Sequence, residues 1–156
     1  MDNRTIDASI PCITLWEPWA TLVSLGLKTI ETRTHARFFC LNGKRIGIHA
    51  GKHIDTAGLN DLFRRGVVCS DINELIEMNM GHIICTARVI AVGTIPRTSY
   101  SEYAKCEINE NIYGLFLRDV APSGRIRADG RQGIWYYSPA KPAKQQNLEL
   151  TVFSTT

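Results

Sequence analysis

The chain has 156 residues, of which 44% are hydrophobic and 21% charged, a composition typical of a single globular domain large enough to bury a core. Charged residues interrupt every apolar run before it reaches the length of a membrane span, and the polar start of the chain lacks the apolar segment of a signal peptide. We therefore expect a cytoplasmic protein that has no membrane partner.

The net charge of +3 is unevenly distributed along the chain. Residues 28–52 contain six Lys or Arg and a single acid, Glu31, and a second basic group follows between residues 118 and 131. Local basicity of this kind suits a partner that carries phosphate. On charge alone, an ordinary mixed surface is an equally good interpretation.

The first predicted elements are a strand and a helix. Residues 1–10 are expected to be a flexible lead-in, and residues 12–15 to form a short strand. Pro18 suits the first turn of a helix, where its missing N–H is not needed, and Gly26 suits the end of that helix. Apolar residues between them recur at helical spacing and predict one buried face.

Strands and helices then alternate irregularly. Ser70 is expected to cap one of the helices, and Gly93 to mark a bulge or bend in the longest strand. A capping-box pattern begins at Ser99. Strands are expected at residues 29–33, 45–50, 83–95, 113–120 and 134–138, with helices at residues 55–65 and 70–78 and a short helix from residue 99.

This irregular order determines the expected fold class. Helices do not follow every strand, which excludes a regular βαβ repeat and predicts an α+β fold whose mixed sheet curls into a small β-barrel with helices packed around it. The main domain is expected to span residues 11–138. Residues 139–156 form a C-terminal tail in this interpretation, with a possible edge strand at residues 151–153.

The cysteines and histidines argue against a bound metal. The five cysteines are odd in number and include no Cys-x-x-Cys pair, which disfavours both a disulfide framework and a zinc knuckle. The His, Cys and Asp residues do not follow a metal-ligand spacing, and the chain has neither a Walker loop nor a dinucleotide-binding glycine pattern. We expect no metal site and no cofactor.

The most informative segment is Gly26–Arg33, which contains Lys28 and Glu31. On an extended strand Glu31 and Arg33 project from the same face. A perfectly extended backbone would turn Lys28 away from Glu31, but the glycine before it can relax that geometry, so the sequence leaves the side of Lys28 open. A carboxylate beside cations can accept hydrogen bonds from base amino groups, and Arg33 can bind a phosphate or brace that carboxylate. Lys28 is a candidate phosphate contact or base. The alternative interpretation is an internal ion-pair network that only orders the fold.

Five further residues are candidates for the same site. Trp16 and Trp19 are possible stacking surfaces for a base, although Trp19 more often belongs to a core. His49 is the best general acid–base candidate among the histidines, with a core role as its alternative. Lys52 follows His49 into a loop. Arg131, in a Gly-Arg-Gln-Gly turn, either reaches a phosphate or is part of a plain surface turn.

The segment Gly26–Arg33 resembles the G-x-K-x-x-E-x-R signature of ASCH domains, a branch of the PUA-like superfamily. Four other stretches resemble family members in the same order, so that the resemblance spans roughly residues 11–138. They are Leu15–Ala20, Ile48–Lys52, Tyr113–Leu117 and Gly130–Trp135.

This resemblance implies a PUA-like mixed β-barrel with a cleft lined by Lys28, Glu31 and Arg33, and a role in RNA or nucleoside recognition. Some members resemble ribonucleases. A smaller bacterial branch removes the acetyl group of N4-acetylcytidine with a Lys and a Thr of the signature and a distant Glu. Lys28 matches that lysine, whereas Glu31 occupies the position of that threonine.

Three functional hypotheses remain open. The first, which we rank highest, is binding of single-stranded RNA, a nucleotide or a modified nucleoside. The second is hydrolysis, by a ribonuclease or an N4-acetylcytidine-type amidohydrolase, with Lys28, Glu31 and His49 as candidate catalytic residues. The third is a protein-interaction module in which the ionic residues are purely structural. The sequence indicates no oligomeric state.

Overall fold

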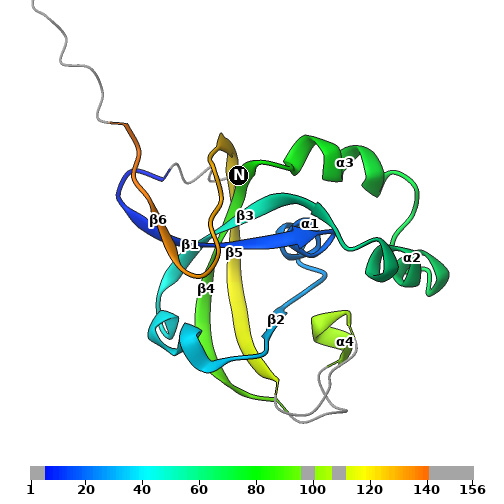
Figure 1. The fold of residues 1–156 in the computed structure, drawn as a ribbon, viewed down its shortest axis with the longest axis horizontal. Coiled ribbons are helices and arrows are strands. Elements are labelled where there is room, and N and C mark those ends of the chain that lie inside the picture. Colours follow the sequence, from blue (N-terminus) through cyan, green and yellow to red (C-terminus); the bar gives the residue numbers. More distant parts are fainter. Residues whose placement is uncertain (1–5, 96–100, 107–111, 141–156) are drawn as a thin grey trace, which may run out of the picture.

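A six-stranded sheet forms the body of the protein in a computed structural model that describes residues 6–95, 101–106 and 112–140 (Figure 1). The order of its strands is β2-β5-β4-β3-β1-β6. β1 and β3 run parallel, and every other neighbouring pair is antiparallel. The strands are β1 (Ile10–Glu17), β2 (Ile30–Arg33), β3 (Arg45–Ile54), β4 (His82–Thr94), β5 (Tyr113–Arg127) and β6 (Trp135–Tyr137).

Short helices connect the strands. Gly26 has a φ of +74° and follows α1 directly, as expected for a glycine that ends a helix. Asp55 begins α2, because its carboxylate accepts a hydrogen bond of 2.9 Å from the backbone N–H of Gly58. The helices are α1 (Trp19–Ser24), the 3₁₀ helix η1 (Ala36–Leu41), α2 (Thr56–Arg64), α3 (Ile72–Asn79) and α4 (Ser101–Ala104).

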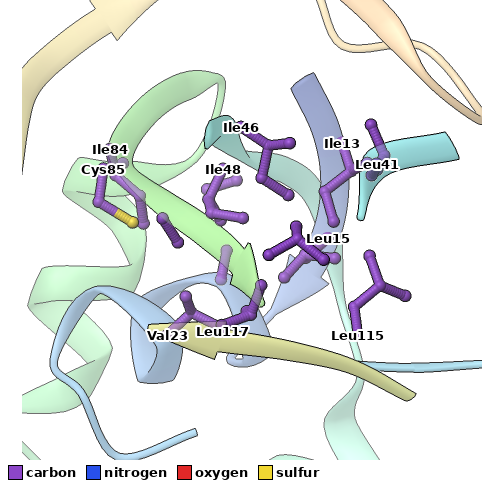
Figure 2. Packing of buried hydrophobic residues seen from close by; sticks show 14 of the residues in the cluster. Ile13, Leu15, Val23, Leu41, Ile46, Ile48, Ile84, Cys85, Leu115 and Leu117 are labelled. Atoms are coloured by element: carbon purple, nitrogen blue, oxygen red, sulfur yellow. The ribbon is translucent and has the colours of Figure 1, made fainter. Parts of the chain in front are cut away.

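The main core lies between the concave face of the sheet, α1 and η1 (Figure 2). Alternate residues of β3 point into it, and Ile46 and Ile48 are both fully buried, as their spacing predicts. Val23 of α1 and Leu41 of η1 close the core at its sides. A second cluster unites Leu22 of α1 with apolar residues of α2 and α3, which fixes these helices beyond the end of β3.

The sheet does not close into the expected barrel. β2 lies at one edge and β6 at the other, and within the described residues no backbone ladder joins the two ends. The sheet nevertheless curls, because its longest pair, β4 and β5, contains three register shifts that increase the local twist. Its two ends are therefore brought near each other, and side chains rather than backbone hydrogen bonds span the seam between β2 and β1.

Two local predictions differ from the structure. Gly93 pairs in register with Gly114, so the bulges of β4 lie earlier in the strand and not at Gly93. The residue that precedes α3 is Asp71 rather than Ser70, and its side chain makes no capping hydrogen bond. The predicted strand at residues 151–153 and the start of the capping box at Ser99 lie outside the described residues.

Part of the expected N-terminal lead-in packs against the sheet. Ile6, in the expected lead-in, is buried against Cys12 and Trp135. None of the helices that the structure describes is long and apolar enough to cross a membrane.

Candidate functional site

A cleft of about 630 Å³ occupies the open seam of the sheet. One wall comes from β1, the opposite wall from β2 and η1, and a third side from the loop of residues 130–134 that precedes β6. Its volume lies in the range of small-ligand pockets. The site thus exists because β1 and β2 lie near each other without a backbone hydrogen-bond ladder between them.

Glu31 lies on the floor of this cleft between two cations. Its Oε2 is 3.6 Å from Lys28 Nζ, and its Oε1 is 3.2 Å from Arg33 Nε. Glu31 is only 8% exposed and Lys28 only 1%. The Lys28 amine also donates a 2.6 Å hydrogen bond to the Ala104 carbonyl of α4, so it lies beneath the cleft rather than on its surface.

The turn after α1 explains why Lys28 joins Glu31 instead of pointing away. The backbone N–H groups of Leu27 and Lys28 both donate to the Leu22 carbonyl, at 3.0 and 3.2 Å. Lys28 is therefore still in the turn that ends the helix, and regular strand geometry begins only at Ile30. The alternation that holds along β2 does not extend back to Lys28.

Arg33 links the two walls of the cleft. Its guanidinium carbon lies 4.9 Å from the centre of the Phe38 ring, and its Nη2 donates to the Thr14 carbonyl of β1 at 3.4 Å. The His35 ring also stacks on Phe38, at 5.2 Å and 18°, and its buried Nδ1 has no hydrogen-bond partner. His35 lines the cleft, but this nitrogen faces its wall and not its open space.

The two candidate tryptophans differ in their contacts and exposure. The Trp19 indole donates to Asp55 Oδ2 at 3.1 Å, and its ring lies 5.1 Å from Lys28 Nζ, so its orientation is fixed from both sides. Trp16 is 54% exposed and contacts the His53 ring, with 3.8 Å between ring centres. Both tryptophans line the cleft.

His49 lies behind the cleft wall and not in the cleft. It is 3% exposed, and its Nε2 donates to the Ala128 carbonyl at 2.8 Å, since a carbonyl can only accept. Burial lowers the pKa of His49 below its usual value. Its contacts hold the segment after β5 against β1, which differs from the acid–base role considered for it. Lys52 is exposed and does not line the cleft, whereas Arg131 lines its rim.

A second buried acid, Glu17, lies between the two tryptophans in the chain. It is 0% exposed, one of its oxygens accepts from the backbone N–H of Thr21 at 3.3 Å, and Oε1 has no partner. Burial raises the pKa of Glu17 to about 7, and the hydrogen bonds from Thr21 offset only part of that rise. The carboxyl group therefore changes its charge near neutral pH inside the fold.

Several residues that line the cleft were not among the sequence-based candidates. Thr14, His35 and Arg37 line the cleft together with Phe38. The segment that follows the signature offers a retrospective signal, because a His, an Arg and a Phe come within five residues of Arg33. Thr14 had no such signal, since its place depends on how β1 pairs with β3. Among the described residues, no group of three or more His, Cys, Asp or Glu side chains is placed to hold a metal ion.

Comparison with known proteins identifies the family. A family model described as "ASCH domain" matches residues 13–148. The chain belongs to the ASCH domain family. A crystal structure of ASCH from Zymomonas mobilis is similar to this ASCH domain, with 17% sequence identity and a TM-score of 0.53 over 81% of this chain and 86% of that one. No curated protein sequence matches the chain.

A crystal structure of the S128A mutant of ZmASCH gives the same result. It has 17% identity and a TM-score of 0.53, over 84% of this chain and 89% of that protein. At this level of identity the likeness concerns the fold alone. The α+β architecture of this ASCH domain is therefore shared with both structures, and the roles of its cleft residues have to be argued from its own geometry.

Proposed function

We propose that the cleft binds single-stranded RNA, a nucleotide or a modified nucleoside. The observation that carries this proposal is the position of Glu31, a carboxylate fixed between Lys28 and Arg33 on the floor of an aromatic-lined cleft. A carboxylate held in this way accepts hydrogen bonds from the amino groups of a base. Its orientation is set before a ligand arrives, because both cations are themselves held by other groups.

The aromatic walls support a planar ligand. Trp16 offers an exposed indole at the entrance of the cleft, and the half-buried Trp19 lines it further along. Stacking of a base on an aromatic ring contributes about 1–3 kcal/mol and accepts any base. The floor would then select among bases, while the walls hold whichever base enters.

The charges of the rim support a ligand that carries phosphate. Arg37 and Arg131 line the cleft, and neither forms an ion pair among the described residues. Glu31 is the only acid that lines the cleft within the described part of the chain, and Lys28 and Arg33 already pair with it. The surplus positive charge at the rim suits phosphate groups. Family membership supports the same proposal, because the ASCH resemblance implies RNA or nucleoside recognition.

The position of Lys28 favours binding over hydrolysis. A lysine that acts as a base has to reach the reacting group, and the amine of Lys28 is enclosed by Glu31, Trp19 and the Ala104 carbonyl. His49 is likewise committed to structural hydrogen bonds. Binding is therefore the function that the geometry supports best.

The test is a titration of the purified protein with a short single-stranded RNA and with mononucleotides at two salt concentrations. Arg131→Gln is expected to weaken RNA binding and to lower the salt slope by about one unit. Arg127→Gln is the matched control, because Arg127 is an exposed arginine on β5 that does not line the cleft. Absence of binding to RNA and to every nucleotide, or equal effects of the two substitutions, would contradict the proposal.

A further inference from the structure

A hydrogen-bonded chain runs from β6 through the cleft wall to the loop before β6. The Trp135 indole N–H donates to Thr14 Oγ1 at 3.0 Å. The same Oγ1 lies 3.2 Å from His49 Nδ1, and His49 Nε2 lies 2.8 Å from the Ala128 carbonyl. Thr14 lines the cleft, whereas the other three groups lie behind it.

The direction of each hydrogen bond in this chain can be assigned. An indole nitrogen can only donate and a carbonyl oxygen can only accept, so Trp135 donates to Thr14 and His49 Nε2 donates to Ala128. Burial lowers the pKa of His49, so the ring is neutral at neutral pH. The hydrogen of the neutral ring is on Nε2, which leaves Nδ1 bare. Nδ1 therefore accepts the hydroxyl hydrogen of Thr14.

This assignment limits what Thr14 can offer to a ligand. Its single hydrogen is used toward His49, and Trp135 occupies one of its two lone pairs. Any further hydrogen bond of this hydroxyl must use the remaining lone pair. We infer that His49 is a positioning residue that fixes Thr14 as a hydrogen-bond acceptor in the cleft, and that the cleft selects ligands whose edge donates N–H groups.

Glu31 reinforces the same preference. Its carboxylate is an acceptor only, and Arg33 connects it to β1 through the hydrogen bond to the Thr14 carbonyl. The inference rests on the proposed function and narrows it: bases that carry an amino group are preferred over the same bases without one. Guanine and cytosine carry such amino groups. Hypoxanthine lacks the amino group of guanine and keeps one edge N–H, and uracil has a carbonyl in place of the cytosine amino group and also keeps one N–H.

The surroundings of His49 keep the chain of hydrogen bonds in place. Gly130 packs so closely on the imidazole that a Cβ atom there would lie 2.5 Å from the ring. The His49 and Trp135 rings meet edge to face, with 5.4 Å between ring centres and an angle of 83° between ring planes. The titratable groups that act on His49 are His82 of β4, which lowers its pKa, and Asp129, which raises it, and both effects are smaller than that of burial.

The test compares matched nucleotides by calorimetric titration. Guanosine monophosphate is expected to bind more tightly than inosine monophosphate, and cytidine monophosphate more tightly than uridine monophosphate. Thr14→Val keeps the shape of the side chain without its hydroxyl and is expected to reduce these ratios about fivefold, the contribution of one hydrogen bond. Thr14→Ser restores the hydroxyl and is expected to restore the preference.

Two His49 variants separate positioning from general structural support. In His49→Asn the amide oxygen replaces Nδ1 and can still accept from Thr14, so the preference is expected to persist. His49→Gln replaces the Nε2 contact to Ala128 and loses the acceptor for Thr14, so the preference is expected to weaken. If these variants do not fold, the Thr14→Val and Thr14→Ser pair still decides the matter.

The pH profile supplies a readout that a purely structural histidine would not change. Protonated His49 donates from both nitrogens, which releases the Thr14 hydrogen for a ligand. The preference for amino-bearing bases is therefore expected to hold at neutral pH and to decrease only at a pH below the ordinary His value of about 6.5, because burial lowers the pKa of His49 in the folded protein. In Thr14→Val, which lacks the hydroxyl, the reduced preference is expected not to change with pH. Equal binding of both members of each pair to the wild-type protein would overturn the inference and leave nucleotide binding intact. Absence of binding to any nucleotide would overturn the proposed function as well.

Discussion

Lys28 Nζ lies 3.6 Å from Glu31 Oε2 in a region where both residues are almost completely buried. Removing one member of a buried ion pair leaves the other without compensation, which costs about 3–5 kcal/mol. We expect Lys28→Met and Glu31→Gln each to lower the free energy of unfolding by roughly 3 kcal/mol. The double variant is expected to lose much less than the sum, because no fully buried charge is then left without its partner and Arg33, which also loses Glu31, is partly exposed.

Urea unfolding of the wild-type protein and the three variants measures this coupling. Arg33 remains beside Glu31 in Lys28→Met, so this single variant is expected to be the milder one. Additive losses in the double variant would show that the two side chains do not interact.

Asp55 has two roles that a single substitution removes. Its carboxylate caps α2 and also accepts the indole N–H of Trp19. Asp55→Ala is expected to lower stability by about 1–2 kcal/mol. It is also expected to shift the fluorescence of Trp19 and to weaken ligand binding. Asp71→Ala is the control, because Asp71 precedes α3 without a capping hydrogen bond, and an equal loss there would contradict this account.

Gly130 is expected to tolerate no side chain. A Cβ atom at this position would lie 2.5 Å from the His49 ring and 2.6 Å from Thr14 Oγ1, and both groups are held by other contacts. Gly130→Ala is expected to cost about 1–3 kcal/mol and to weaken binding in the cleft. In Gly93→Ala the new methyl group meets open space, so its thermal midpoint should stay close to that of the wild type. Comparable losses in both variants would argue against the close packing.

Glu17 makes stability fall as the pH rises toward neutrality. Its pKa is about 7 in the folded protein and near 4.5 in the unfolded chain, so between these values the folded state binds more protons and loses stability with increasing pH. Glu17→Gln removes this loss, which is roughly 3 kcal/mol at 1.36 kcal/mol per pKa unit. We expect the variant to be more stable than the wild type at pH 8 and not at pH 4, as measured by denaturant unfolding. If the difference in stability between Glu17→Gln and the wild type is the same at pH 4 and pH 8, the prediction is wrong.

His49 has the opposite effect on the pH dependence of stability, and it does so at lower pH. Because burial lowers its pKa in the folded protein, the unfolded chain binds the proton more readily, and stability falls as the pH drops below about 6.5. The effect is best isolated in the Glu17→Gln background, where the larger opposing contribution is absent. A stability profile in that background that stays flat from pH 7 to pH 5 would refute the assignment of a neutral, buried imidazole.

The sequence predicted most elements for local reasons. Gly26 ends α1 with a positive φ, and the alternating isoleucines of β3 face the core. Family membership was also predicted, from the signature at Gly26–Arg33, and is confirmed by the family model. The prediction of a closed barrel was wrong. Local patterns show which side of a strand faces the core, but not whether the two edge strands of a sheet pair with each other.

Part of the candidate site could be predicted from the sequence in the same way. Strand alternation placed Glu31 and Arg33 on one side, as the structure has them. It left the position of Lys28 open, because that position depends on the turn after α1. Thr14 and Phe38 could not be predicted as neighbours of Arg33, since their contacts depend on the curl of the whole sheet. The roles of the cleft residues remain predictions.

The register shifts between β4 and β5 affect the width of the cleft from a distance. None of the residues at these shifts lines the cleft, yet the shifts increase the bend of the sheet and hence influence how far β2 stands from β1. A deletion that straightened this pair would spread the two walls and break the Arg33 bridge without touching a single cleft residue. Insertions or deletions in this strand pair are therefore expected to change the width of the cleft.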